Sequence, residues 1–198
     1  MDPGDFLCLK HGEYKMKSMI KFALLPSVLL MSAGAFATST LDQAQINLTG
    51  SVTNNASTFC NMSVPKSIDL GQVDLNDIIL APAGKDIHPV DFQVKIRNCV
   101  ANKPVHIRFM AVSTTENSYI AQNAQGVDGA QYVGVAFREV IGGQSTPLDP
   151  MGTSTPDQTD SDGMATHDFT ASIVRTTSAN EPTSGPVYVS ATLTLEAI

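Results

Sequence analysis

The last thirteen residues of the chain, Pro186–Ile198, alternate between apolar and polar side chains, and this pattern restricts the possible fold more than any other feature. A period of two places alternate side chains on opposite faces of a β-strand. A strand with one apolar and one polar face is typical of an antiparallel sheet that covers a core on one side. The apolar positions are Val187, Val189, Ala191, Leu193, Leu195 and Ala197.

Five further segments have strand patterns, and helical periodicity is almost absent. They are Ser67–Leu75 (with a change of phase at Gly71), Pro89–Cys99, Pro104–Val112, Gln131–Val140 and Thr166–Thr176. A glycine at a change of phase favours a bulge or a switch of the strand between sheets. We expect Pro89–Cys99 and Pro104–Val112 to form a hairpin, Ile141–Gln144 to form a turn, and Leu75–Leu80 to form a helical turn. Together these patterns predict one antiparallel β-sandwich of immunoglobulin-like size.

The N-terminal region is typical of a signal peptide. An apolar run, Met19–Met31, follows Lys15 and Lys17, and Ala35 and Ala37 form a small-residue cleavage motif. We therefore expect a signal peptide over residues 16–37. A membrane anchor is the alternative, and it is disfavoured because the apolar run is too short to span. Residues 1–15, with Cys8, do not resemble the start of a signal peptide, so they are interpreted as a doubtful extension.

Charge and cysteine content restrict the possible partners and cofactors. The formal net charge is −7 at pH 7, which argues against nucleic acid as a partner. Beyond the signal peptide the cysteines are Cys60 and Cys99, and an isolated pair in an exported protein is most simply a disulfide. Companion ligands at zinc spacing are absent, so we expect no metal and no cofactor.

The segment Ala44–Val52 also alternates like a half-buried strand, although it lies just after the predicted cleavage site. Terminal segments fray unless something holds them. Two interpretations are open: this segment is the first strand of its own domain, or it pairs with another molecule.

The order of these segments resembles the pilin subunits of bacterial chaperone–usher fimbriae over residues 38–198. The resemblance comprises the alternating N-terminal strand, the two cysteines about forty residues apart, and Ile68–Val73. It continues with the strand that leads into Cys99, Tyr132–Phe137, Asp168–Ile173, and a glycine, Gly185, before the last strand. The family usually has an aromatic residue at the penultimate position, where this chain has Ala197.

The resemblance implies an all-β, incomplete immunoglobulin-like sandwich, in which residues 38–53 are an N-terminal donor strand and residues 54–198 are the pilin domain. It implies that an apolar groove lies beside the last strand, and that a neighbouring subunit donates a strand to that groove. The donor residues are Ala44, Ile46, Leu48, Gly50 and Val52. The groove and chaperone-facing residues are Gly185, Val187, Val189, Ala191, Leu193, Leu195 and Ile198.

The implied function is that of a structural subunit exported through the periplasm to a cell-surface fimbrium, with a role in adhesion. Its implied partners are a periplasmic pilus chaperone, an outer-membrane usher and neighbouring pilins in a head-to-tail polymer. A minor tip or adaptor subunit, or an adhesin that binds a host glycan, is the alternative.

Catalytic chemistry finds no support in the sequence. The acidic segment Pro156–Gly163 resembles part of a calcium loop, but Gln158 and Phe169 occupy two of the ligand positions, so a solvated loop is the preferred interpretation. The histidines do not cluster, and a nucleophile-elbow motif is absent. We therefore expect no catalytic residues, and an unrelated sandwich enzyme is disfavoured.

Overall fold

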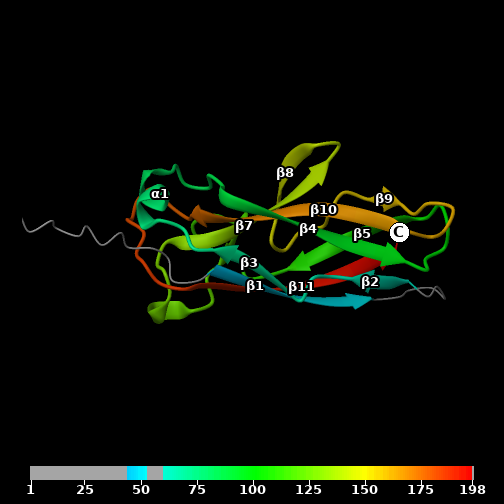
Figure 1. The fold of residues 1–198 in the computed structure, drawn as a ribbon, viewed down its shortest axis with the longest axis horizontal. Helices are drawn as coiled ribbons and strands as arrows, with labels where there is room; N and C mark the ends of the chain where they lie inside the picture. Colours follow the sequence, from blue (N-terminus) through cyan, green and yellow to red (C-terminus); the bar gives the residue numbers. More distant parts are fainter. Residues whose placement is uncertain (1–43, 53–59, 198) are drawn as a thin grey trace, which may run out of the picture. The chain divides into compact units, whose positions relative to one another are not determined.

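A computed structural model describes residues 44–52 and 60–197, which form a sandwich of two β-sheets (Figure 1). One sheet has the order β3 (Ser67–Gly71), β1 (Ala44–Val52), β11 (Val187–Ala197), β5 (Pro104–Met110), β9 (Asp157–Gln158). The other has the order β2 (Asn61–Ser63), β4 (Ile87–Arg97), β10 (Ala165–Arg175), β7 (Val133–Ile141), β6 (Ile120–Gln122). Strand β8 (Gln144–Leu148) pairs with β7, and the helices are α1 (Leu75–Leu80) and the 3-10 turn η1 (Gly126–Asp128). The predicted all-β sandwich is confirmed.

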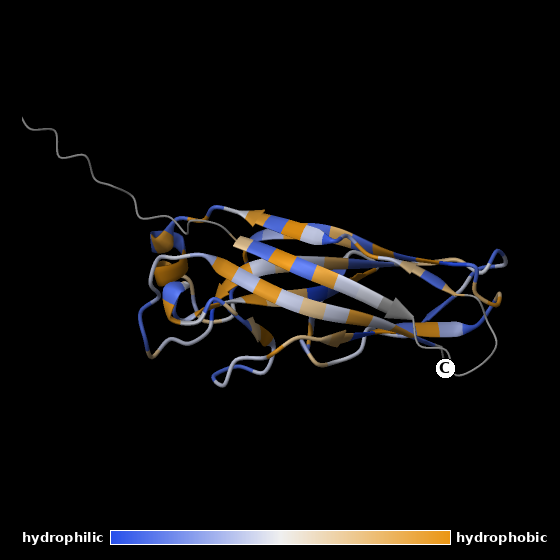
Figure 2. Ribbon diagram, turned by 90° about the horizontal axis from the view of Figure 1, so that it is seen from below, coloured by the Kyte–Doolittle hydropathy of each residue, from blue (hydrophilic) through white to orange (hydrophobic). Residues whose placement is uncertain are grey.

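Apolar side chains of the two sheets meet in one core, and hydrophobic and polar residues alternate along the strands in Figure 2. Phe109 of β5 lies 5.1 Å from Phe169 of β10 and 5.5 Å from Phe137 of β7, measured between ring centroids. These contacts join the two sheets, and Phe92 of β4 stacks on Phe169 at 5.4 Å. Aromatic pairs at such distances stabilise beyond the area they bury.

Several local predictions are confirmed. The helical turn forms as α1, and the Asp74 carboxylate caps it by accepting a hydrogen bond from the Asn76 backbone N–H at 2.9 Å. The predicted turn after β7 joins β7 to β8, because Ile141 pairs with Gln144. Gly142 and Gly143 between them have φ values of 57° and 81°, which a two-residue hairpin turn of this kind requires.

The predicted hairpin between Pro89–Cys99 and Pro104–Val112 is wrong. β4 pairs with β10 and β2, whereas β5 pairs with β11 and β9, so the chain crosses from one sheet to the other. The crossing segment bonds elsewhere: the Cys99 N–H donates to the Gly163 carbonyl and the Asn102 N–H to the Thr159 carbonyl. These hydrogen bonds satisfy backbone N–H groups of the segment between β4 and β5, so this segment is stable without a hairpin between the two strands.

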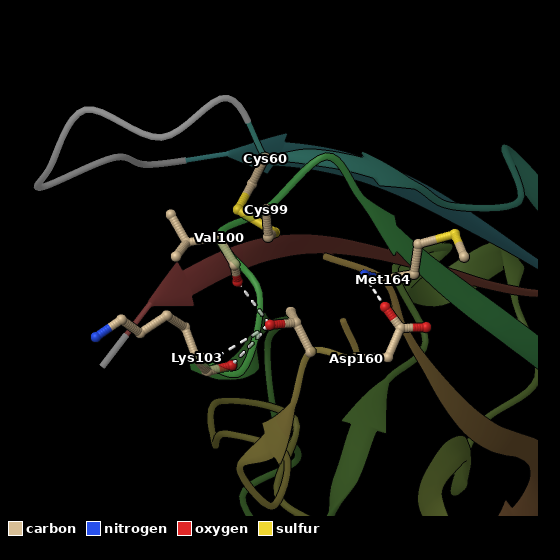
Figure 3. The surroundings of a disulfide bond; sticks show 7 residues. Cys60, Cys99, Val100, Lys103, Asp160 and Met164 are labelled. Carbon is tan, nitrogen blue, oxygen red and sulfur yellow. Dashed lines mark hydrogen bonds between the residues drawn. A yellow bond between two sulfur atoms is a disulfide. The ribbon is translucent and has the colours of Figure 1, made fainter. Parts of the chain in front are cut away.

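The crossing defines one end of the sandwich, named here the disulfide end, where Cys60 and Cys99 form the predicted disulfide. Val100 and Lys103 lie beside this disulfide (Figure 3). The Thr159 hydroxyl donates to the Val100 carbonyl at 2.7 Å and also contacts the Lys103 carbonyl. These bonds fix the connection between β4 and β5 against the loop before β10.

The opposite end, named here the α1 end, contains the end of β10 and the starts of β7 and β11. The Arg175 guanidinium donates to the Ile79 carbonyl of α1 at 2.9 Å and to the Asn180 carbonyl at 2.7 Å. The Thr176 N–H donates to the Tyr132 carbonyl just before β7, and the Thr183 N–H donates to the Gln131 carbonyl. Arg175 therefore joins α1 to the loop that leads into β11.

The predicted signal peptide (16–37), the doubtful extension (1–15), residues 38–43 and Ile198 lie outside the described residues. No helix of the described part is long and apolar enough to cross a membrane.

Candidate functional site

Strand β1 lies in the first sheet, with β11 on one side and β3 on the other. It runs parallel to β11 in an unbroken register from Ala44 opposite Val187 to Val52 opposite Leu195. It runs antiparallel to β3, and this second pairing covers only residues 44–47. The segment predicted to be a donor strand therefore occupies the sheet of its own chain in this structure.

The apolar residues of β1 up to Leu48 lie on its buried face, as their alternation in the sequence predicted. Ala44, Ile46 and Leu48 point into the core and are at most 4% exposed. All five predicted groove residues of β11 are likewise buried: Val187, Val189, Ala191, Leu193 and Leu195. The predicted strand and the predicted groove wall thus meet residue by residue, one apolar position opposite another.

Gly50 is exposed, but β1 has no room for a side chain at this position. A Cβ atom built there would lie 2.9 Å from Val64 Cγ2 and 3.1 Å from Met62 Cε, both closer than ordinary contact. The missing side chain therefore lets β1 pass these two residues. The resemblance placed Gly50 among the donor residues, but the sequence could not identify Val64 and Met62 as its neighbours.

Beyond Leu48, β1 is paired on one side only. The Leu48 N–H still donates to the Lys66 carbonyl at 3.1 Å, but β3 does not continue alongside Thr49–Val52. A groove of about 800 Å³ is lined by residues of β1 between Gln45 and Gly50 and by residues of the segment Met62–Ser67. Parallel ladders are slightly less stable per residue than antiparallel ones. The position of β1 is therefore held mainly by β11 and by burial of its apolar face.

Two polar contacts on the outward face also join β1 to β11. The Asn47 side-chain amide donates to the Tyr188 hydroxyl at 2.6 Å, and the Thr49 and Thr192 hydroxyls lie 3.1 Å apart. The alternation predicted that these residues face outward, but it did not reveal the pairs. Cross-strand pairs of this kind add a few tenths to about 1 kcal/mol each.

The start of β11 is held by a loop that sequence reasoning did not single out. The buried Asn123 accepts a hydrogen bond from the Tyr188 N–H at 2.9 Å and donates to the Pro186 carbonyl at 2.9 Å. The Ala130 N–H also donates to the Pro186 carbonyl. Gly185 just before it has φ of 146°, and a Cβ there would lie 2.7 Å from the Ala130 nitrogen.

The substitution Gly185→Ala is expected to destabilise the fold by about 2–4 kcal/mol, because it adds backbone strain and a clash with a hydrogen-bonded loop. Equilibrium unfolding in urea measures this loss. Gly126→Ala is the matched control: Gly126 also has positive φ (61°), but a Cβ there meets nothing within 4 Å. Equal losses for the two variants would mean that the close approach to Ala130 is unimportant.

Near the C-terminal end of β11, Glu196 forms a charged cluster with β5. Its carboxylate accepts a hydrogen bond from Arg108 Nε at 2.6 Å and lies 2.7 Å from His106 Nε2. The Arg108 hydrogen bond, followed by that of His106, lowers the pKa of Glu196 to about 2. The cluster joins β5 and β11 on the outward face.

This cluster predicts a pH dependence of stability. Because the pKa of Glu196 is lower in the folded state than its ordinary value of 4.5, the cluster stabilises the fold above about pH 4.5 and ceases to do so as the pH falls towards 2. Glu196→Gln is expected to lower Tm at pH 7 by roughly 1–3 °C, a small effect because the pair is partly exposed to solvent. Scanning calorimetry between pH 2 and 7 should find that the difference between wild type and variant shrinks on acidification. The control is Glu181→Gln, whose carboxylate has no ion pair within the described residues; a difference that persists at pH 2 contradicts the prediction.

The acidic segment is organised by its own backbone. The Asp160 carboxylate accepts hydrogen bonds from the Asp162 N–H at 2.9 Å and the Met164 N–H at 2.8 Å, the second of which is drawn in Figure 3. Asp160 thus shapes a turn. Within residues 44–52 and 60–197, no three His, Cys, Asp or Glu side chains are placed to hold a metal ion.

One buried ionisable pair was not anticipated. His167 Nδ1 lies 3.5 Å from Glu139 Oε1, and the Thr155 N–H donates to Glu139 Oε2 at 2.8 Å. Burial raises the pKa of Glu139, but the hydrogen bonds from His167 and Thr155 outweigh it, so the pKa lies below its ordinary value. The pair anchors the segment that crosses from β8 to β9. From the sequence, His167 was expected at the start of a strand as a satisfied or exposed surface histidine, whereas it is buried.

Comparison with known proteins identifies the class. The fimbrial protein family model matches residues 46–197, and the chain belongs to this family of pilus subunits. Among solved structures, the chain is similar to the P pilus rod subunit PapA, at 19% identity and a TM-score of 0.53, over 70% of this chain and 99% of that one. It is also similar to a subunit from a structure of a chaperone–usher pilus that addresses rod uncoiling, at 19% identity and a TM-score of 0.52, over 75% and 95% of the two chains. At these identities the matches establish the fold. No curated protein matches the chain in sequence.

Proposed function

We propose that this protein is a structural subunit of a chaperone–usher fimbria and polymerises by donor-strand exchange. In that process β1 of one copy leaves its own sheet and enters the position beside β11 of a neighbour. Family membership supports the subunit role. The observation that carries the exchange is the register of β1 with β11, in which Ala44, Ile46 and Leu48 are buried against alternate residues of the last strand.

The arrangement of β1 supports its role as an exchangeable strand. Its covalent connection to the rest of the described fold is residues 53–59, and about half of its length is paired with β11 alone. Main-chain hydrogen bonds to β11 give such a strand affinity, and its alternate side chains give it register. The same strand position can therefore be filled by another copy of the same nine residues.

An unfilled position beside β11 would be hazardous. It would expose the apolar faces of Val187–Leu195 together with an unpaired strand edge, which is a template for aggregation. We propose that a periplasmic chaperone protects this groove until an outer-membrane usher presents the next subunit. We also propose export under the signal peptide at residues 16–37, with residues 38–53 as the donor segment and 54–198 as the pilin domain. The proposed role is mechanical, with no catalytic step.

The test is refolding from denaturant at low and at high protein concentration, followed by electrophoresis in SDS without heating. At low concentration we expect monomers that have closed on their own β1. At high concentration we expect a ladder of SDS-resistant multimers, because strands from other copies compete for empty grooves. A chain that remains monomeric at every concentration, while folding normally by circular dichroism, overturns the proposal.

A further inference from the structure

A pocket of about 320 Å³, named here the Tyr132 pocket, lies where two loops approach the end of β10. The first loop joins β5 to β6, and the second joins β6 to β7 and contains η1. Among the described residues that line this pocket, none belongs to β1 or β11, so it is separate from the groove proposed for strand exchange. Protein pockets that bind small molecules commonly measure about 300–1,000 Å³, so this pocket fits a small ligand of one or two rings.

Hydrogen bonds hold the two loops of the Tyr132 pocket in place. The Thr114 N–H donates to the Ile120 carbonyl at 2.8 Å and closes the first loop. The Gln131 side-chain amide donates to the Gly126 and Gly129 carbonyls at 2.7 and 3.0 Å and closes the second loop. The pocket is therefore formed before a ligand arrives, which lowers the cost of ordering the loops on binding.

Tyr132 lines the pocket in a backbone conformation that large residues rarely adopt. Its φ is 57°, in the left-handed region, where glycine would be free of steric strain. The Tyr132 carbonyl accepts a hydrogen bond from the Thr176 N–H at 3.0 Å, and the Gln131 N–H donates to the Thr183 hydroxyl at 2.9 Å. These bonds impose the conformation on both sides of the residue. Backbone strain of this kind clusters at ligand-binding sites, so a tyrosine here indicates a use for its side chain.

Three exposed side chains of the pocket have polar groups that the described part of the protein does not use. Glu116, Gln122 and Tyr132 form no side-chain hydrogen bond or ion pair with other described residues. A carboxylate accepts hydrogen bonds, whereas an amide and a phenol both donate and accept them. The tyrosine ring adds an apolar face beside these groups. This combination matches a ligand that has several hydroxyl groups around an apolar C–H surface.

The charge of the pocket restricts the ligand further. Among its described lining residues, none is Lys, Arg or His, and the one ionised side chain is that of Glu116. A carboxylate, sulfate or phosphate group of a ligand would therefore meet a like charge without a compensating cation, which is unfavourable.

We propose that the Tyr132 pocket binds a neutral saccharide of one or two sugar rings. One ring stacks on Tyr132, and its hydroxyl groups form hydrogen bonds with Glu116 and Gln122. This inference goes beyond the proposed structural role, because it gives the subunit a ligand site outside β1 and its groove. The monomer contains the whole pocket, so binding does not depend on polymerisation.

The test begins with the full chain, refolded at low concentration, on an array of oligosaccharides that end in galactose, glucose, mannose or N-acetylglucosamine. Sialylated and sulfated forms of the same oligosaccharides are included. We expect binding to neutral members and weaker binding to members whose terminal sugar is acidic. An array without a bound neutral saccharide overturns the proposal, and so does a preference for the acidic forms.

Calorimetric titration with the neutral oligosaccharide that binds best then locates the site. Tyr132→Ala is expected to weaken binding about tenfold because it removes the stacking face, whereas Tyr132→Phe should weaken it only about threefold. Glu116→Gln, at an exposed position, is also expected to weaken binding about tenfold, because hydrogen bonds to a charged group are the stronger ones.

The matched controls are Tyr119→Ala and Glu181→Gln, whose exposed side chains do not line the pocket. Both should bind like wild type, and circular dichroism verifies that every variant is folded. If Tyr132→Ala fails to fold, Glu116→Gln and Tyr132→Phe decide the outcome. Wild-type affinity in Tyr132→Ala and Glu116→Gln overturns the proposal, as does an equal loss in the two controls.

Discussion

Replacing Leu48 with aspartate is expected to abolish SDS-resistant multimers. Leu48 is 4% exposed at the centre of β1 and faces Ala191, so the substitution removes a buried leucine and places a carboxylate in the core. The loss of leucine burial alone costs about 2–5 kcal/mol, and an unpaired buried charge adds to it. The strand should therefore fail both in its own groove and in that of a neighbour.

Thr49→Asp is the matched control for Leu48→Asp, because Thr49 is exposed on the opposite face of the same strand. It should form multimers at close to the wild-type level. Adding a synthetic peptide of residues 44–52 to the Leu48→Asp variant should restore its resistance to unfolding, since the groove itself is unchanged. Multimers of the Leu48→Asp variant at the wild-type level would show that the inward face of β1 does not hold the subunits together.

Removal of the disulfide by the double substitution Cys60→Ser, Cys99→Ser is expected to destabilise the fold by about 4 kcal/mol. The bond joins residues 39 apart in sequence, and closing a loop of this length restricts the unfolded chain. The expected fall in Tm is roughly 8–16 °C for a domain of this size. Scanning calorimetry measures it, with reduced wild type as the control that should match the variant. An unchanged Tm would contradict the prediction.

The disulfide also lies where the connection from β1 enters the rest of the described fold. Cys60 directly follows residues 53–59, and Cys99 lies two residues after the end of β4 at Arg97. The bond thus attaches Cys60, where the connection from β1 ends, to the end of β4 in the second sheet. We expect the double serine variant to lose strand exchange as well as stability, because the tether no longer starts from a fixed position.

The side-chain period of two was sufficient to predict the faces of the long strands. It assigned the inward positions of β1 and β11 and, with the cysteine pair, the sandwich. It could not assign neighbours, because a strand's alternation is the same whichever sheet it joins. The wrong hairpin between β4 and β5 has this cause. The bonds that separate these strands come from Thr159 and Gly163, some sixty residues further along the chain.

Other features of the site depend on contacts between distant parts of the chain. The tight position of Gly50 is set by Met62 and Val64, and the start of β11 is held by Asn123. Alternation also contains no information on direction, so the parallel orientation of β1 could not be predicted. The ion pair of Glu139 and His167 was missed because the two side chains interrupt otherwise apolar inward faces.

The short tether between Val52 and Cys60 gives the chain's own strand a kinetic and thermodynamic advantage. A strand tethered by so few residues has an effective concentration in the millimolar range at its own groove. A strand of another copy present at about one micromolar must overcome a roughly thousandfold difference, or about 4 kcal/mol. Under the proposed donor-strand exchange, a free subunit is therefore its own competitive inhibitor. Growth of the polymer then depends on any factor that keeps β1 out of its groove, or that makes the joint between two copies stronger than the internal one.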